Sequence, residues 1–307
     1  MSKRNPNHIK NGSSVATAIV YAILIVLALI CIYPVWYVII ISVSEPIAAR
    51  TMDVFLLPKG FYFGSYAQVV EDSQIWVSYG NTILYAVSCT IGMLIVCAMA
   101  AYPLTSPYMR GKRLMSFFIL IPMYFSGGLI PQFILMSNYL HLYDTRWAII
   151  FPGIVSMWYI ILVRTFFMSI DEALRESARI DGANNYQILL HVYVPTSKPI
   201  MAVIAIYTLV AQWNSWYAAM IYLPSASKQP LQLYLRRMLI LQEKVAQQQS
   251  GTQGGTSEDG EAAMLAALSA EQLRYTMIVV ATLPIMLVYP FLQKYFVKGV
   301  MVGSLKG

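Results

Sequence analysis

The sequence predicts an all-α protein that crosses a membrane several times. Hydrophobic residues make up 58% of its 307 positions and charged residues 11%, whereas a soluble domain carries about 25% charged residues. Several apolar stretches are about 20–28 residues long, which is enough to cross the hydrocarbon core of a bilayer as a helix. No strand-like alternation runs through these stretches, and backbone groups in lipid must be satisfied internally, so we expect each stretch to be a helix.

Six transmembrane helices are expected, one for each apolar stretch. They lie near residues 15–43, 78–103, 114–137, 146–168, 199–222 and 275–297. The first stretch is about twice as long as the core of a signal peptide, so we expect an uncleaved helix. The third contains Pro122, Gly127, Gly128 and Pro131, residues that break a membrane helix. Such a break either lines a translocation path or is a kink that packs on neighbouring helices.

Lysine and arginine determine the expected orientation. An even number of crossings puts both ends on one side, and about 13 of the 21 basic residues lie on that side, which favours the cytoplasm. The connection 169–198 is then cytoplasmic, and the segment 223–274 faces outward. Within the outer segment, the glutamine- and glycine-rich residues 245–265 favour local disorder and are either a contact with an external partner or a tolerated insertion. The expected domains are a cytoplasmic N-terminus, 1–14, a transmembrane domain, 15–298, and a cytoplasmic tail, 299–307.

Charge and isolated reactive residues argue against several other classes. The net charge of +7 is accounted for by cytoplasmic loops, and no basic cluster is interleaved with exposed aromatic residues, so nucleic acid is not expected as a partner. The cysteines lie inside apolar stretches and the histidines are scattered singly, so we expect neither a disulfide nor a metal site. These residues are Cys31, Cys89, Cys97, His8, His141 and His191.

The connection between the fourth and fifth helices, residues 169–198, carries helix signals of its own. Ser169 and Glu172 have the spacing of a capping box in front of the sequence EALRESARI. Gly182 is a natural helix stop, and Asn184 can cap a second short helix.

Other side chains of this connection suggest a docking surface. Glu176 and Arg179 are three residues apart and can pair on an exposed helix face. The small Ala178 permits close approach by a partner. Pro195 is expected to end the second helix as the chain re-enters the membrane.

This connection resembles the cytoplasmic loop of permeases from binding-protein-dependent ABC importers. That loop reads EAA, three residues, Gly, nine residues, Ile-x-Leu-Pro. Here ESA at 176–178 is followed by Gly182 and then by VYVP at 192–195 with the same spacing, and the three departures are conservative. The resemblance covers nearly the whole chain. Trp213-Asn214 and the ending QKYFVKGVMVGSLKG are similar to the carbohydrate branch, in particular to permeases of the maltose type and of complex oligosaccharides.

The resemblance implies a type I ABC importer permease fold with a cytoplasmic coupling helix. Closure of a dimer of ATP-binding subunits would push on that helix and switch the permease between inward-facing and outward-facing states. The residues implied to couple to the ATPase are Glu172, Glu176, Ala178, Asp181, Gly182, Ala183 and Pro195. The C-terminal residues implied to contact the ATPase are Gly299, Gly303 and Lys306.

The same resemblance implies a non-catalytic subunit of a larger assembly in the cell membrane. Its partners would be a second permease in a heterodimer, the dimer of ATP-binding subunits, an extracytoplasmic sugar-binding protein and membrane lipid. ATP and Mg²⁺ would be bound by the ATPase, and this chain would hold no cofactor. The chain contains no G-x-x-x-x-G-K-[ST] loop, which is the usual cradle for nucleotide phosphates. The expected function is ATP-driven import of a sugar or oligosaccharide.

Polar and aromatic residues within the predicted helices are candidates for a substrate path. They are Asn81, Gln132, Trp213, Asn214, Trp216 and Tyr217. The aromatic residues either contact sugar or form an interfacial belt, and Asn81 and Gln132 either line the path or hydrogen-bond neighbouring helices. An ion-coupled secondary transporter is the alternative function. It is disfavoured because the six predicted helices contain no Asp or Glu, residues that such carriers commonly place there. A membrane-embedded enzyme is disfavoured because no Ser/His/Asp or metal-binding set clusters at membrane depth.

Overall fold

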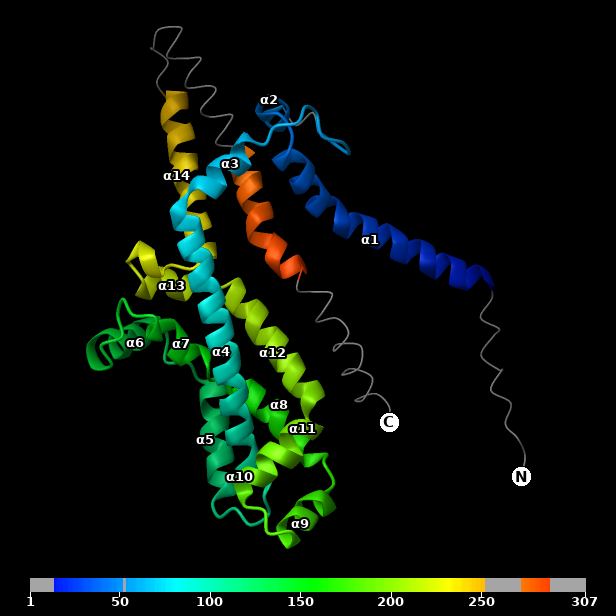
Figure 1. Cartoon of the computed structure of the whole chain (residues 1–307), viewed down its shortest axis with the longest axis vertical. Coiled ribbons are helices and arrows are strands. Elements are labelled where there is room, and N and C mark those ends of the chain that lie inside the picture. Colours follow the sequence, from blue (N-terminus) through cyan, green and yellow to red (C-terminus); the bar gives the residue numbers. More distant parts are fainter. Residues whose placement is uncertain (1–13, 52–53, 252–271, 288–307) are drawn as a thin grey trace. The chain divides into compact units, whose positions relative to one another are not determined.

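The computed structural model describes residues 14–51, 54–251 and 272–287. Within these residues the regular secondary structure is helical, as the sequence predicts, and no strand occurs (Figure 1). The chain divides into two compact units. One comprises residues 1–71 and 241–280, and the other comprises residues 72–240 and 281–307.

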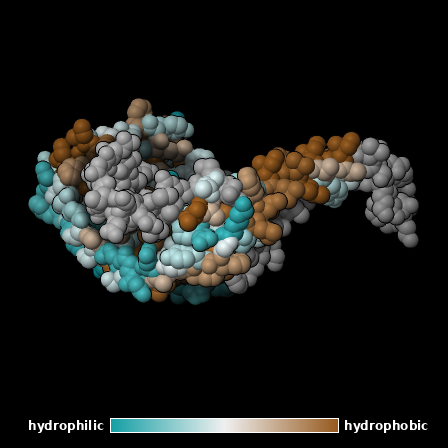
Figure 2. All heavy atoms as spheres, turned by 90° about the horizontal axis from the view of Figure 1, so that it is seen from above, coloured by the Kyte–Doolittle hydropathy of each residue, from teal (hydrophilic) through white to brown (hydrophobic). Residues whose placement is uncertain are grey.

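The first unit begins with α1, Ser14–Ser42, a helix of 29 residues without a charged side chain. Its large side chains from Ile19 to Ile39 are exposed, and they are coloured hydrophobic along most of the helix in Figure 2. A helix that is apolar on every side belongs in a bilayer or against other apolar helices. The predicted first transmembrane helix is therefore confirmed as a candidate span.

The fully buried side chain of Gln272 connects several elements of the first unit by hydrogen bonds, and we call this set of bonds the buried joint. Its Nε2 donates to the carbonyl oxygen of Ser44 at 2.5 Å, and its Oε1 accepts from the hydroxyl of Ser65 at 3.0 Å. The joint links the end of α1 with α3, Gly64–Glu71, and with the apolar helix Gln272–Leu287. The short α2, Pro46–Arg50, lies between α1 and α3 in the sequence.

The second unit is built around α4, Ser73–Thr105, which begins where the carboxylate of Asp72 accepts from the backbone N–H of Gln74. This helix packs against α8, Met157–Met168, and α12, Lys198–Trp213 (Figure 1). Small and branched side chains at the contact allow the three helices to approach closely. The fully buried ones among them are Cys97, Ala101, Val163 and Ile204. The predicted helix near 78–103 is confirmed as a candidate span. The predicted helix 146–168 is also a candidate span, but it is interrupted at 154–156 and consists of α7, Trp147–Gly153, and α8.

The predicted third helix, 114–137, is broken rather than continuous. It consists of α5, Lys112–Tyr124, and of α6, Leu129–Ile134, which continues into the π-helical turn η1, Leu135–Tyr139. The two parts meet at an angle of 112°. The break coincides with Gly128, whose φ of +83° is open to glycine but strained for other residues.

The predicted fifth helix, 199–222, is also wrong in its bounds. It ends at Trp213, and α13, Tyr217–Tyr222, follows as a separate helix. At its start, the preceding helical segment, 185–196, meets α12 at an angle of 81°.

The count of six transmembrane helices is not reached in the described residues. Three helices are long and apolar enough to cross a membrane, and the number rises to five if each bent pair is one span. The helix Gln272–Leu287 is shorter than a span, and the remainder of the predicted sixth helix, 288–297, lies outside the described residues.

The predicted outer segment, 223–274, is partly helical. It contains the 3₁₀ turn η3, Ala226–Lys228, and α14, Leu231–Gly251. The helix covers the first part of the stretch 245–265 for which the sequence favours disorder, and the rest of that stretch lies outside the described residues.

Candidate functional site

The connection 169–198 contains α9, Glu172–Ile180, whose N-cap differs from the predicted one. The carboxylate of Asp171 accepts from the backbone N–H of Ala173 at 3.0 Å. The predicted cap, Ser169, instead donates its hydroxyl to the carbonyl oxygen of Phe166 at 2.7 Å. Both residues can cap a helix. Asp171 directly precedes the first helical turn, and its charge also favours the positive end of the helix dipole.

Gly182 ends this first helix, as the sequence predicts. Its φ is +82°, a left-handed conformation that glycine adopts without a clash of a β-carbon. The chain then turns directly into the second helix.

The second short helix, α10, Asn185–Ile188, carries the capping box of this connection. The side-chain oxygen of Asn184 accepts from the N–H of Gln187 at 2.9 Å, and the side-chain oxygen of Gln187 accepts from the N–H of Asn184 at 2.8 Å. The predicted cap at Asn184 is confirmed. These paired bonds satisfy two backbone donors at the start of a helix.

Pro195 does not end the second helix, in contrast to the prediction. A π-helical turn, η2, Leu189–Tyr193, leads into α11, Val194–Thr196, which contains Pro195. A π-turn accommodates a residue that lacks the N–H needed for regular α-helical bonding. The hydroxyl of Thr196 donates to the carbonyl oxygen of Val192 at 2.7 Å. The chain bends one residue later, at the fully buried Ser197.

The basic residues of α9 have partners that differ from those predicted. Arg175 is 3% exposed and forms an ion pair with Glu172. The guanidinium of Arg179 lies over the ring of Tyr108, 4.9 Å from its centroid, instead of forming the predicted pair with Glu176. Both the ion pair and the cation–π contact hold basic side chains against the protein.

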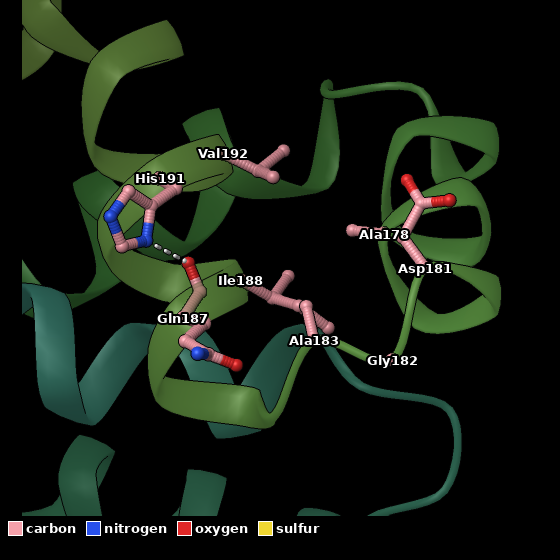
Figure 3. A pocket seen from close by; sticks show the side chains of 8 residues that line it. All are labelled: Ala178, Asp181, Gly182, Ala183, Gln187, Ile188, His191 and Val192. Atoms are coloured by element: carbon pink, nitrogen blue, oxygen red, sulfur yellow. Dashed lines mark hydrogen bonds between the residues drawn. The ribbon is translucent and has the colours of Figure 1, made fainter.

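A cleft of about 320 Å³ separates the two short helices. Ala178 and Asp181 line it from α9, and Ile188 and Val192 face them from α10 and η2 (Figure 3). The ring nitrogen Nδ1 of His191 lies 3.0 Å from the carbonyl oxygen of Gln187 at the rim. The remaining lining residues are Gly182 and Ala183. The lining combines apolar and polar side chains, a mixture that is typical of protein interfaces.

The outer surface of this connection combines apolar and acidic side chains. Ile180 at the end of α9 is 86% exposed, and Tyr186 on α10 is 71% exposed. Glu176 and Asp181 are also exposed. Exposed large apolar residues next to unpaired charge are typical of a protein interaction site.

An aromatic cluster joins the connection to the helices behind it. The ring of Tyr193 lies edge-on to Tyr102 of α4 and to Phe167 of α8, with both centroid distances 5.1 Å. The hydroxyl of Tyr102 also donates to the side chain of Asn185 at 3.4 Å. The cluster and this hydrogen bond therefore join α10 and η2 to the packed core of the second unit.

Two of the candidate substrate-path residues are occupied by contacts within the protein. Asn81 is 3% exposed, donates to the carbonyl oxygens of Ser227 and Gln229 at 2.8 and 3.2 Å, and accepts from Arg146 at 3.2 Å. Trp213 is also buried and donates to the carbonyl oxygen of Ala281 at 3.3 Å. The hydrogen bonds of Asn81 favour a role in bonding neighbouring parts of the protein over contact with substrate. The burial of Trp213 favours neither sugar contact nor an interfacial belt.

The other aromatic candidates lie together at the turn between α12 and α13. Trp216 and Tyr217 are arranged edge to face with centroids 5.6 Å apart, and Arg236 of α14 lies 3.6 Å from the centre of the Trp216 ring. Asn214 ends α12 and donates to the carbonyl oxygen of Val210. Gln132 is exposed on α6.

Sequence reasoning missed a polar network around Asp144. Its carboxylate accepts from the hydroxyl of Ser225 at 2.5 Å and from the ammonium of Lys228 at 2.9 Å. These hydrogen bonds lower the pKa of Asp144 below its ordinary value. The bond from Ser225 has the larger effect, and the bond from Lys228 has the next largest. The network fixes the loop before α14. Asp144 lies 81 residues before Ser225 and 84 residues before Lys228, so no local sequence motif predicts the network.

Sequence reasoning also missed Tyr108 and Arg236. Tyr108 contacts Arg179 and Arg236 contacts Trp216, and in each pair the two residues belong to different elements. The predicted tail residues Gly299, Gly303 and Lys306 lie outside the described part of the chain. In the described ranges, no group of three His, Cys, Asp or Glu side chains is placed to hold a metal ion.

Comparison with known proteins gives a consistent result. Residues 92–302 match the family described as "Binding-protein-dependent transport system inner membrane component". A Bacillus subtilis (strain 168) protein named "Polygalacturonan/rhamnogalacturonan transport system permease protein YtcP" is 33% identical over 289 residues, which cover 94% of this chain and 97% of that protein. The maltodextrin transport system permease protein MdxG of the same organism is 24% identical over 297 residues, or 94% and 95% of the two chains.

A solved structure supports the same relationship at the level of the fold. It is the crystal structure of a bacterial ABC transporter involved in the import of the acidic polysaccharide alginate. The two chains superpose with a TM-score of 0.80 and are 36% identical in sequence, and the match covers 93% of this chain and 98% of the other.

Proposed function

The chain belongs to the family of binding-protein-dependent transport system inner membrane components, and on this premise we propose that it imports an oligosaccharide by docking residues 169–198 on an ATPase. The chain is a multi-pass protein of the plasma membrane and a permease subunit of an ABC importer. ATP is hydrolysed by a separate ATPase, and a binding protein delivers the substrate. These findings leave the ion-coupled transporter without support.

The substrate class is inferred from the relatives. Their names and titles specify polygalacturonan and rhamnogalacturonan, maltodextrin, and alginate, all of which are carbohydrate polymers. We infer that this permease carries an oligosaccharide. Trp216 and Tyr217 are the strongest described candidates for contact with it, because Tyr217 is half exposed and its neighbour presents a ring beside it.

The single observation that carries the docking proposal is the paired-helix surface of α9 and α10. Each helix has its own side-chain cap, the two are joined at a glycine, and a cleft lined by apolar and polar side chains lies between them. A surface can transmit force only if it is locally stiff, and the caps and the aromatic cluster behind it provide that stiffness. To move a two-state equilibrium from 1:99 to 99:1, ATP binding needs a differential affinity of roughly 5.5 kcal/mol between the two permease states.

Orientation, assembly and nucleotide binding complete the proposal. Both ends of the chain face the cytoplasm, which places residues 169–198 on the side where ATP is found. A second, non-identical permease completes the membrane part, and the exposed apolar surface of α1 is available for lipid or for that partner. ATP and Mg²⁺ are held by the ATPase. The tail residues Gly299, Gly303 and Lys306 are proposed to contact it as well.

Variants of the paired-helix surface test the docking proposal. Gly182→Pro forces a residue with φ near −65° into a position at +82°, and Glu176→Ala removes an exposed carboxylate. We expect both variants to insert in the membrane while copurification of the ATPase and uptake fall by at least tenfold. Glu71→Ala, which removes an exposed glutamate from α3, is the matched control and keeps both activities. Full transport by both variants would refute the docking assignment.

A further inference from the structure

Tyr108 lies on the connection between α4 and α5 and presents its ring to α9. The ring centroid is 4.9 Å from the guanidinium carbon of Arg179 and 6.0 Å from that of Arg175. These distances are within the range in which a cation is attracted by the negative face of an aromatic ring. One aromatic side chain thus contacts two basic residues of the proposed docking helix.

The backbone around Tyr108 is fixed by local bonds. The hydroxyl of Ser106 accepts from the N–H of Tyr108 at 3.3 Å, and the hydroxyl of Thr105 donates to the carbonyl oxygen of Tyr102 at 2.7 Å. Gly111 closes the turn with a φ of +77°. The ring is therefore carried by a short, bonded turn directly attached to the end of α4.

The two arginines occupy one face of α9. Because they are four residues apart, their side chains lie one above the other. Arg175 is 3% exposed, pairs with Glu172, and its Nε has no hydrogen-bond partner among the described residues. A buried cation needs compensation by charge or by a ring, and Tyr108 adds the ring.

Apolar packing alone holds α9 weakly. Its large apolar side chains face outward, since Leu174 is 48% and Ile180 is 86% exposed. From this helix, the small Ala178 is the residue that packs against the core cluster, which α10 and η2 form together with α4, α8 and α12. A nine-residue helix is also too short to be stable by itself in water.

We infer that Tyr108 is a positioning residue for energy coupling. It holds α9 to the cytoplasmic end of α4, so that a push on α9 moves α4 instead of tilting α9 alone. The inference rests on the proposed docking of residues 169–198 on an ATPase and adds a second cytoplasmic turn, 106–111, to that mechanism. The ring acts through the arginines and needs no contact with ATP or substrate.

The test uses the complete importer in proteoliposomes, with its ATPase, partner permease and binding protein, and measures substrate imported per ATP hydrolysed. Tyr108→Phe keeps the ring and is expected to keep the ratio. Tyr108→Leu and Arg179→Met each remove the exposed cation–π contact, and each is expected to lower the ratio about two- to fivefold. The double variant is expected to fall no further than either single one. Tyr124→Leu, at a residue 74% exposed at the other end of α5, is the matched control.

The outcomes separate the two proposals. A wild-type ratio in Tyr108→Leu, or additive losses in the double variant, would overturn the positioning role. A loss in Tyr108→Phe equal to that in Tyr108→Leu would overturn it too, because the ring is retained.

If Glu176→Ala and Gly182→Pro keep ATPase docking and uptake, the docking proposal fails. If those two lose both while Tyr108→Leu and Arg179→Met behave as wild type, docking stands and only the role of Tyr108 fails. Normalising to assembled complex separates coupling from simple instability.

Discussion

Asp144 and Asn81 show how single polar side chains organise the end of the second unit remote from α9. Asn81 is buried and bonds two carbonyl oxygens and a guanidinium, whereas Asp144 stays partly exposed and holds Ser225 and Lys228. Both residues fasten the same loop, which precedes α14. These side-chain bonds hold the loop together with its short 3₁₀ turn, η3.

The lowered pKa of Asp144 predicts an effect of acid on this loop. A carboxyl group whose pKa is lower in the folded protein contributes stability above its ordinary pKa of 3.8, and this contribution is lost as the pH falls through the lowered value. We expect Asp144→Asn to unfold at a lower temperature than wild type at pH 7, and the difference to be smaller at about pH 3, because the contribution of Asp144 is lost as the pH falls toward its lowered pKa. Thermal unfolding of the detergent-solubilised chain at both pH values measures this. A difference of equal size at both would contradict the ionic role of Asp144.

At the scale of elements, the sequence could predict helices but not all of their ends. Apolar stretches without interruption, such as α1 and α4, were placed within a few residues. The bend of 112° falls at glycines that the sequence marks as helix breakers, but neither its angle nor the 81° bend can be read from the spacing of apolar residues. Gly182 was predictable because few residues adopt its conformation.

The two candidate N-caps of α9 can be distinguished by substitution. Asp171 accepts from a backbone N–H of the first turn, whereas Ser169 bonds a preceding carbonyl oxygen. Asp171→Ala is expected to destabilise α9 by about 1 kcal/mol, and Ser169→Ala by clearly less. Amide hydrogen exchange of α9 in the membrane-inserted chain measures both. If both variants lose the same amount of amide-exchange protection in α9, the result would support Ser169 as a cap of this helix, as the sequence predicts.

The candidate site was only partly predictable for a related reason. The motif from Glu176 to Pro195 predicts the proposed docking surface, because its residues are close together in the sequence. Tyr108 lies about 70 residues before α9 and belongs to no motif, so its contact with Arg179 required the folded structure. The same holds for Arg236 over Trp216.

At the scale of the whole molecule, the membrane topology remains a prediction from charge. It places the exposed Ile180 in the cytoplasm and the exposed Leu57, in the segment between α1 and α4, outside. In a background with the native cysteines replaced by serine, Ile180→Cys and Leu57→Cys carry one thiol each at residues 86% and 73% exposed.

A membrane-impermeant thiol reagent added to intact cells tests this topology. We expect it to label Leu57→Cys at least tenfold more than Ile180→Cys, and the difference to disappear once the membrane is permeabilised. Stronger labelling of Ile180→Cys in intact cells would invert the topology. The connection 169–198 would then lie away from ATP.

The buried joint at Gln272 has a consequence for how the protein is made. Its amide bonds the backbone of Ser44, 228 residues earlier in the chain. A ribosome that adds about 5–20 residues per second therefore needs roughly 10–50 s between the two. During that interval the end of α1 lacks its glutamine partner. The N-terminal part of the permease thus completes its fold only after residue 272 has been made, and a chain truncated before that residue would leave the carbonyl oxygen of Ser44 and the hydroxyl of Ser65 without this partner.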